Sequence, residues 1–501
     1  MKLIIKWILP IIQAVISATL LYLAATGGFL PGTYMALVAG LVAVLLIITF
    51  VLTRSSKSAV RILGAVLAIL ASGVLMTGAF YIHRVLKTLD QVSEEKVQTS
   101  TFVVSVKAGN AAQTIEETNG YRFGILSDMD AGLTESICGE IADANGDVNL
   151  QTQTFDSPAT MAQALLDGEI DACVLNNAYT DILDEIIEDY STKTRVIYEM
   201  EFETGAAKGA GNNANGTGAD GTAEGAAGDS AANTDGQRAE GSLTSESFTV
   251  LISGIDVRGS ISTTSRSDVN ILMTVNPKTH QILLTTTPRD YYVYIPEVSG
   301  DMRDKLTHAG IYGIRSSMAT LENVYGIPLD YYVRVNFTSL ITIVDALGGV
   351  DVYSEYSFTS RDCSFQAGMN HMNGEQALAF SRARYNFASG DNQRGKNQEA
   401  VLTAIINKVT SPEVLLHADD LIETAAGCTQ TSVSRDEISS LVRRQLQEGA
   451  KWDIVSQAAT GTGDSQPTFS MGSIKLYVMW PNEDVIESLS GKMKDLLEMN
   501  N

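Results

Sequence analysis

Three long apolar runs at the N-terminus constrain this chain more strongly than any other feature of its sequence. They cover about residues 8–25, 34–52 and 62–82, and each is long enough to cross roughly 30 Å of hydrocarbon. None of them has a polar face, which excludes the buried helical core of a soluble protein. Three such runs in succession, without a convincing cleavage site, predict a membrane anchor of three transmembrane helices over residues 1–82 rather than a cleaved signal peptide.

Basic residues beside these runs predict their orientation. Lys2 and Lys6 precede the first run, and residues 53–61, between the second and third runs, carry three more Lys or Arg. Positively charged flanks stay in the cytoplasm. The third run then leaves the cytoplasm, so we expect a multi-pass protein of the cell membrane, embedded in membrane lipid, with residues 83–501 on the extracellular side.

Acidic residues dominate the exported part of the chain. The formal net charge is −23, and residues 90–248 alone carry 29 acidic against 7 basic side chains. A surface of this charge repels phosphate, so we expect no nucleic-acid partner. The charge is still compatible with a local basic pocket.

Residues 101–203 predict a small α/β accessory domain. Strand-like runs such as YRFGILS alternate with helical runs such as ATMAQALLDGEI, which favours a largely parallel sheet. The segment SPATMAQALLDGEIDACVLNNAYTDIL loosely resembles one lobe of the solute-binding-protein fold. Because about a hundred residues provide only one lobe, a scaffold or contact role is favoured over ligand binding.

Residues 204–245 differ in composition from the segments on either side. Gly, Ala, Asn, Asp and Ser dominate them, and no large aliphatic residue occurs before Leu243. Such a segment buries too little apolar surface to offset its ordering entropy. We therefore predict a disordered linker here.

Four cysteines lie in the exported region, and two interpretations of them stay open. Cys138 could pair with Cys173, and Cys363 with Cys428, as exported proteins often form disulfides. Isolated buried thiols are equally compatible with the sequence. None of the four has metal-ligand spacing.

Charged side chains stand at the ends of the apolar strands that follow the linker. The runs TVLISGID, VNILMTVN and HQILLTTTPRD predict three strands, whose ends carry Asp256, Arg266, Asp268 and Arg289. Any one of these could be a solvated loop charge, but carboxylates that alternate with guanidinium groups at a sheet edge favour a shared site. Asp carboxylates suit a hard divalent cation, and Arg forks suit phosphate oxygens.

A second cluster of cationic and amide side chains follows about a hundred residues later. In the run SRARYNFASGDNQRGKNQEAVL, Arg382 and Arg384 are followed by Asp391, Arg394 and Gln398. In an otherwise acidic protein this cluster predicts a binding pocket for an anion.

Five segments together resemble the LytR-CpsA-Psr family in order and spacing. They are TSRSDVNILMTVN, TTTPRDYYVYIP, DKLTHAGIYG, LENVYGIPLDYYVRVNFTSLITIVDALGGVDV and MNGEQALAFSRARYNFASGDNQRGKNQEAVL. The resemblance implies a LytR-CpsA-Psr domain over residues 248–501, with its core at 248–411. It also implies the family's fold, an αβα sandwich with a central mixed sheet and an apolar groove for a lipid tail.

The same resemblance implies an activity. Members of the family are membrane-anchored envelope enzymes that act as phosphotransferases. They take an anionic glycopolymer, such as teichoic acid or capsular polysaccharide, from a polyprenyl-phosphate carrier and attach it to peptidoglycan. A Mg²⁺-dependent enzyme, or one that uses Mn²⁺, is therefore expected, with the lipid-linked polymer and peptidoglycan as its partners.

Individual residues match the family's motifs, and the resemblance implies their roles. The metal-associated carboxylates are Asp256 and Asp268. The catalytic positions are Arg289, Arg382, Arg384 and Asp391. The substrate-binding positions are Arg266, Lys305, Arg394 and Gln398. One departure follows Lys305, where the family often has a double Gly and this chain has AGIYGI, which leaves the shape of the lipid-facing loop open.

Two alternative functions would use the same pocket. One is a non-catalytic envelope sensor or adaptor that binds phosphorylated lipid, and the other is a polyprenyl-pyrophosphate phosphohydrolase. The presence of every acidic and basic motif position favours catalysis over binding alone. The sequence does not separate transfer from hydrolysis, because that depends on whether peptidoglycan or water reaches the phosphorus.

Overall fold

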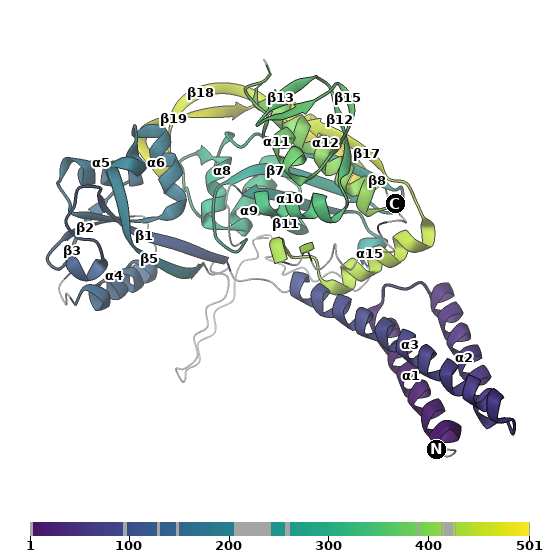
Figure 1. The fold of residues 1–501 in the computed structure, drawn as a ribbon. Helices are drawn as coiled ribbons and strands as arrows, with labels where there is room; N and C mark the ends of the chain where they lie inside the picture. Colours follow the sequence, from purple (N-terminus) through teal and green to yellow (C-terminus); the bar gives the residue numbers. More distant parts are fainter. Residues whose placement is uncertain are drawn as a thin grey trace, which may run out of the picture.

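The computed structural model describes a bundle of apolar helices, an accessory domain and a C-terminal domain (Figure 1). The described residues are 4–93, 98–127, 131–146, 150–204, 242–255, 261–387, 390–411, 414, 424–425 and 427–499. The predicted linker lies outside them, except for its first residue and its last four.

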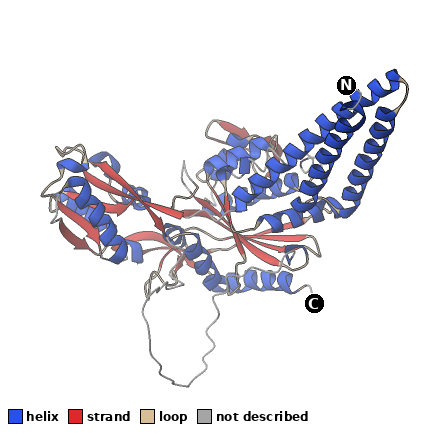
Figure 2. Cartoon of the chain, turned by 90° about the horizontal axis from the view of Figure 1, so that it is seen from below, coloured by secondary structure: helices blue, strands red, loops and turns tan. Residues whose placement is uncertain are grey.

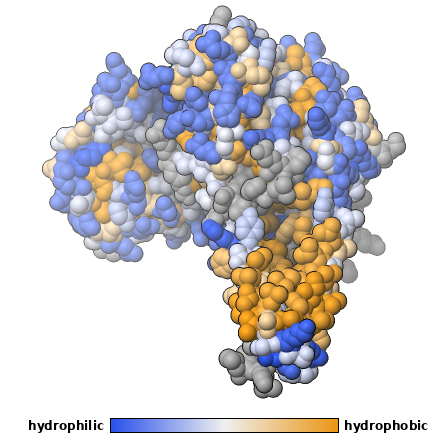
Figure 3. All heavy atoms as spheres, turned by 45° about the vertical axis from the view of Figure 1, so that its right-hand side comes forward, coloured by the Kyte–Doolittle hydropathy of each residue, from blue (hydrophilic) through white to orange (hydrophobic). Residues whose placement is uncertain are grey.

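Three long helices form the N-terminal bundle: α1 (Leu9–Gly27), α2 (Gly32–Arg54) and α3 (Ser58–Ser93). A short π-helical turn, Ile4–Ile8, precedes α1. All three helices are long and apolar enough to cross a membrane, and Figure 3 shows their apolar side chains as one orange surface. By length and composition, the predicted three-helix anchor is confirmed.

Helix α3 extends beyond the bundle toward the C-terminal domain (Figure 1). Its 36 residues span about 54 Å at about 1.5 Å per residue, against roughly 30 Å of hydrocarbon. Near its end, Asp90 Oδ1 lies 2.8 Å from Nη1 of Arg435. Arg435 is the first residue of α15 (Arg435–Glu448), so the helix contacts the C-terminal domain directly.

The accessory domain is a five-stranded sheet flanked by short helices. Its strand order is β3-β2-β4-β1-β5. Its elements are β1 (Gln98–Lys107), β2 (Arg122–Leu126), α4 (Ala131–Asn145), β3 (Gln151–Phe155), α5 (Pro158–Asp167), β4 (Ala172–Asn176), α6 (Thr180–Ile186), α7 (Tyr190–Lys193) and β5 (Thr194–Thr204).

The expectation of a largely parallel sheet is wrong for half of this domain. β2 is parallel to β3 and β4, but β1 is antiparallel to both β4 and β5. In the sheet, β4 lies between β1 and β2, so the direction of β1 is set by its pairing with β4 and β5. The resemblance to a solute-binding lobe stays a prediction.

Three of the cysteines settle the disulfide question. Cys138, Cys173 and Cys363 are free thiols, so neither pairing forms. Cys173 is fully buried in β4, and burial raises the pKa of its thiol to about 12. It packs as a small apolar residue.

A six-stranded mixed sheet organises the C-terminal domain, in the order β16-β11-β6-β7-β8-β17. β6 is parallel to β11, and β8 is parallel to β17, while the β6–β7, β7–β8 and β11–β16 pairs are antiparallel. The strands are β6 (Phe248–Ile255), β7 (Ser267–Asn276), β8 (Gln281–Thr286), β11 (Tyr331–Val335), β16 (Gln430–Thr431) and β17 (Asp453–Ala458).

Helices cover both faces of this sheet (Figure 2). Alternate residues of one strand point to opposite faces, so Leu251 packs toward α9 (Ile314–Tyr325) and α16 (Glu483–Glu498). Its neighbour Val250 packs in the other core, with residues of α12 (Asp391–Val409) and of α15. The predicted αβα sandwich with a central mixed sheet is confirmed.

Shorter elements surround the sandwich and carry much of the site. They are β9 (Tyr292–Val293), β10 (Asp304–Lys305), α8 (Leu306–Ala309), α10 (Phe337–Ala346), β12 (Val350–Ser354), β13 (Phe358–Ser360), β14 (Cys363–Phe365), β15 (Gly368–Met372), α11 (Gly374–Arg382), β18 (Gly461–Thr468) and β19 (Gly472–Pro481). The long β18–β19 hairpin reaches the accessory domain (Figure 1).

The accessory and C-terminal domains share one apolar core. Ile182 and Leu183 of α6 belong to the same buried cluster as Ile311, Met471 and Leu476 of the C-terminal domain. A hydrogen bond of 3.0 Å between the hydroxyls of Tyr179 and Tyr312 crosses the same contact. The two domains are therefore packed against each other through side chains.

Candidate functional site

Two antiparallel strands bring the predicted charges to one edge of the sheet. β7 begins at Ser267, β8 ends at Thr286, and Ile271 pairs with Thr286 across the two strands. In an antiparallel pair the start of one strand meets the end of its neighbour. Asp268, near the start of β7, therefore comes close to Arg289, just after β8.

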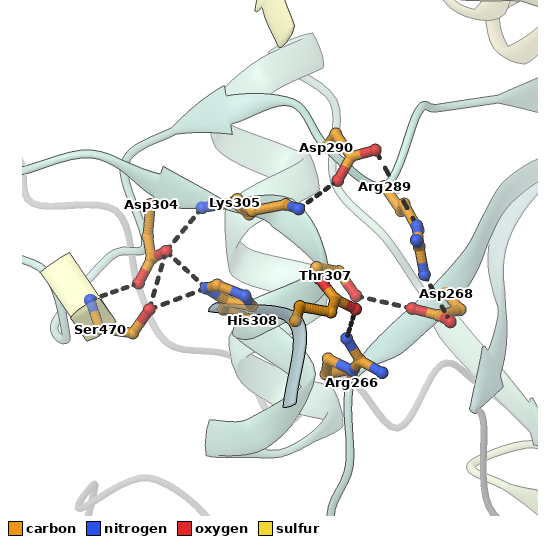
Figure 4. Close-up of polar contacts among 10 residues, drawn as sticks. Arg266, Asp268, Arg289, Asp290, Asp304, Lys305, Thr307, His308 and Ser470 are labelled. Atoms are coloured by element: carbon orange, nitrogen blue, oxygen red, sulfur yellow. Dashed lines mark hydrogen bonds and ion pairs between the residues drawn. The ribbon is translucent and has the colours of Figure 1, made fainter. Parts of the chain in front are cut away.

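Asp268 lies at the centre of this group (Figure 4). Its Oδ2 accepts a hydrogen bond of 2.8 Å from Arg289 Nη1, and its Oδ1 accepts one of 2.9 Å from Thr307 Oγ1. Burial opposes ionisation of this carboxyl, but the charges of Arg289 and Arg266 outweigh burial and lower its pKa. Asp268 is therefore a carboxylate at neutral pH, oriented by two donors.

A second ion pair lies beside the first. Nζ of Lys305 is 2.5 Å from Oδ1 of Asp290, and both residues are buried. Antiparallel pairing of β10 with β9 places Lys305 opposite Tyr292. Oδ2 of Asp290 also lies 3.9 Å from Nε of Arg289, so this carboxylate joins the two cations. Because the ammonium group of Lys305 would be buried and uncompensated without Asp290, the pair holds it in one place.

Arg266 receives its partners from the accessory domain. Its Nη1 donates to Glu185 Oε1 at 3.0 Å, and its Nη2 donates to Asp181 Oδ2 at 3.4 Å. Both carboxylates belong to α6, and the sequence reasoning missed them. They precede Arg266 by about eighty residues, so no local spacing connects them with the R-S-D motif.

A cavity opens between the sheet edge and α12. Four predicted residues, Asp268, Arg289, Arg394 and Gln398, line it. Arg394 and Gln398 are four positions apart on α12, which places them on one helical face. A guanidinium group on each side and a carboxylate on the sheet side suit a ligand that carries phosphate and a counter-cation.

Arg382 and Arg384 come from the end of α11 and the turn that follows it. Cζ of Arg382 lies 4.0 Å from the ring centre of Phe337, and Cζ of Arg384 lies 5.5 Å from that of Tyr385. Neither arginine is among the described residues that line the cavity. The structure therefore places this pair in the same domain as the Asp268 group but not on the wall of that cavity.

Glu399 is a buried carboxyl group beside the cavity that the sequence reasoning missed. It is 4% exposed, its Oε1 accepts a hydrogen bond of 2.7 Å from Thr286 Oγ1, and Thr286 lines the cavity. Burial raises the pKa of Glu399 to about 7. A signal was present, since Leu402 and Ile406, three and seven positions later, pack on the sheet from the same helical face.

A buried Asp–His–Ser cluster also escaped the sequence reasoning (Figure 4). Nδ1 of His308 lies 2.7 Å from Asp304 Oδ1 and 2.8 Å from Ser470 Oγ. Both contacts use the same ring nitrogen, whereas nucleophilic catalysis needs one nitrogen for each partner. The cluster therefore fastens the turn between β18 and β19 to α8.

Two predicted site residues lie outside what the structure describes: Asp256, and the side chain of Asp391, whose backbone begins α12. Within the described ranges, no group of three His, Cys, Asp or Glu side chains could hold a metal ion. The other expected metal ligand, Asp268, lies within the described part of the chain, and its role in metal binding stays a prediction.

Parts of the chain are similar to known proteins. Residues 213–487 match the LytR_cpsA_psr family. The chain is 35% identical over 195 residues to the polyisoprenyl-teichoic acid–peptidoglycan teichoic acid transferase TagU of Bacillus cereus, a match that covers 39% of this chain and 63% of that protein. Identity to TagU of Bacillus subtilis is 31% over 252 residues, covering 50% and 78%. The crystal structure of B. subtilis TagU matches with a TM-score of 0.40 and 29% identity, covering 50% of this chain and 97% of that one. The chain thus spans less than two thirds of the Bacillus cereus relative.

Proposed function

Because this chain belongs to the LytR-CpsA-Psr family, we propose that it is a phosphotransferase that moves an anionic glycopolymer from a polyprenyl-phosphate carrier to peptidoglycan. Teichoic acid and capsular polysaccharide are the polymer classes that fit. The observation that carries the proposal is the cavity in which Asp268, Arg289, Arg394 and Gln398 meet. The names of the Bacillus relatives support it.

The proposed reaction is a phosphoryl transfer. A peptidoglycan hydroxyl attacks the phosphorus that joins the polymer to its carrier, a P–O bond to the acceptor forms, and the bond to polyprenyl phosphate breaks. Catalysis of such a step is mostly positioning and charge neutralisation. Arg289 and Arg394 neutralise charge from the cavity wall, Arg382 and Arg384 donate from the end of α11, and Asp391 accepts the proton of the attacking hydroxyl.

A divalent cation, Mg²⁺ or Mn²⁺, is part of the proposal. Asp268 is ionised, and such a carboxylate is a preferred ligand of a hard cation. Its two donors, Arg289 and Thr307, leave lone pairs on both oxygens, and Asp256 is the proposed second ligand. When bound, the cation supplies positive charge to the pyrophosphate oxygens.

The anchor fits this role. The three helices hold the domain in the cell membrane, where a polyprenyl carrier resides, and we propose that residues 83–501 lie outside the cell. Lys2 and Lys6, together with the basic loop at residues 53–61, support this orientation. Membrane lipid, the lipid-linked polymer and peptidoglycan are then the partners.

The test is a reconstituted reaction. The full chain in lipid vesicles is given lipid-linked polymer, peptidoglycan oligomers and Mg²⁺, and the products are separated by size and mass. A covalent polymer–peptidoglycan adduct is expected, and its loss in an Arg289→Ala variant would connect it with the cavity. The matched control is Arg361→Ala, which removes an exposed Arg between β13 and β14.

Other products would identify the other functions. Free polymer bearing a terminal phosphate, with no adduct, would indicate a phosphohydrolase. Lipid binding without turnover would indicate a sensor or adaptor. Either result would contradict the proposed transfer.

A further inference from the structure

Helix α6 of the accessory domain presents two carboxylates to a single arginine of the site. Asp181 and Glu185 are four positions apart, so they lie on one helical face, toward Arg266. The other face of α6, with Ile182 and Leu183, belongs to the core shared with the C-terminal domain. Packing of α6 therefore fixes where the two charges stand.

Exposure differs sharply between the two sides of this contact. The side chain of Arg266 is 9% exposed, whereas those of Asp181 and Glu185 are 67% and 51% exposed. The carboxylates can return to water at little cost, because exposed ion pairs contribute little. The buried guanidinium, in contrast, needs compensation at all times, and the nearby charge of Asp268 supplies part of it. Arg266 can therefore exchange the α6 carboxylates for another anion.

The carboxylates stand at an end of the guanidinium where a phosphate group can bind. Glu185 accepts from Nη1 and Asp181 accepts from Nη2, and a phosphate can fork across the same two nitrogens. Arg266 stands two residues before Asp268, which lines the cavity. A phosphate and the α6 carboxylates therefore compete for this end of Arg266 and for its charge.

We propose that Asp181 and Glu185 act as an internal anion that occupies Arg266 until the pyrophosphate group of the carrier displaces them. The proposal rests on the proposed function, since it assigns Arg266 to the phosphate-bearing substrate. Substrate binding then frees the two side chains from Arg266 while α6 stays packed, and the accessory domain regulates access to the site. Two acidic side chains of the accessory domain then take part in substrate binding.

Neutralising the two carboxylates tests the proposal. In the Asp181→Asn/Glu185→Gln variant of the full chain in detergent, calorimetry with inorganic pyrophosphate, with and without Mg²⁺, should show roughly fivefold to tenfold tighter binding than in the parent. The matched control, Asp167→Asn/Glu169→Gln, removes the same charge from the exposed end of α5 and the turn after it, in the same domain. It should bind like the parent, which excludes a general effect of net charge.

A double-mutant cycle assigns the gain to Arg266. In an Arg266→Ala background, neutralising Asp181 and Glu185 should change pyrophosphate affinity by less than about twofold, because the carboxylates no longer compete for a donor. A gain that persists in this background would overturn the proposal.

The remaining outcomes separate this proposal from the proposed function. Unchanged or weaker binding in the Asp181/Glu185 variant, with transfer activity intact in the parent, would overturn the internal anion alone and make the pair a structural contact. Pyrophosphate binding absent from the parent and every variant, together with no transfer product, would overturn both.

Discussion

Replacing Glu399 with Gln should stabilise the protein at neutral and alkaline pH and have little effect in acid. Gln keeps an oxygen that can accept the hydrogen bond from Thr286, and it has nearly the same size. What it removes is the ionisable proton of a carboxyl group that is 4% exposed. The two proteins therefore differ mainly in the cost of charging a buried group.

The pKa of Glu399 fixes the sign and size of this effect. Burial raises the pKa from 4.5 to about 7 in the folded protein. A raised folded-state pKa contributes stability below the unfolded value, and this contribution is lost as pH rises through the folded value. At about 1.36 kcal/mol per pH unit, roughly 3 kcal/mol is lost between about pH 4.5 and pH 7, and the Gln variant does not lose it.

Thermal unfolding in detergent measures the difference. The full chain and its Glu399→Gln variant are melted at several pH values from 4 to 8, and the difference between their Tm values is plotted against pH. For a domain of this size we expect that difference to grow by roughly 6–12 °C over the range. The control is Glu355→Gln, which neutralises an exposed carboxylate. Its partner Lys396 lies on α12, the helix that also carries Glu399. Parallel curves for the parent and Glu399→Gln would refute the reasoning.

Four further predictions concern the site, the topology and the linker. Arg382→Ala and Arg384→Ala should each lower kcat by roughly two to three orders of magnitude and leave the melting curve unchanged. Lys at either position should restore only part of the lost kcat, because an ammonium lacks the two parallel donors of a guanidinium. Full activity in the Ala variants would contradict the proposed role. Asp268→Asn should weaken the dependence of turnover on Mg²⁺, measured by EDTA titration, and turnover of the parent that EDTA leaves unaffected would contradict the metal proposal. Protease added to wall-less cells should digest residues 83–501, and protection of these residues would overturn the orientation. Deleting residues 205–241 should leave expression of both flanking domains unchanged.

Local sequence patterns were sufficient for the strands that carry the site. Successive side chains of the run VNILMTVN point to opposite faces of the sheet, so Leu272 faces one helical layer and Ile271 faces the other. The charged side chain of Asp268 stands directly before this apolar run. The alternation of buried side chains and the position of a strand end depend on residues that are close in sequence, so both can be predicted from a single sequence. The meeting of Asp268 with Arg289 followed from the same pattern, since two adjacent antiparallel strands bring their ends together.

Features that depend on distant residues could not be predicted in this way. The partners of Arg266 belong to another domain, and their pairing depends on how α6 packs against Met471 and Leu476. The direction of β1 depends on its place in the finished sheet, which the alternation of strands and helices does not specify. The pKa of Glu399 depends on burial by the assembled domain, although its helical face could have been identified.

The continuity of α3 has a geometric consequence for how the C-terminal domain is held relative to a membrane. The same unbroken helix contains the apolar span and contacts α15 through the ion pair of Asp90 with Arg435. The number of helical residues between the apolar span and Asp90 therefore sets the height and the direction of the C-terminal domain. One residue more or fewer would turn the domain by about 100° around the helix axis and shift it by about 1.5 Å. Seven residues, close to two turns, would restore the direction but change the height by about 10 Å. The length of α3 thus determines which way the cavity faces and how far it stands from the headgroups, and all copies in one membrane would share that setting.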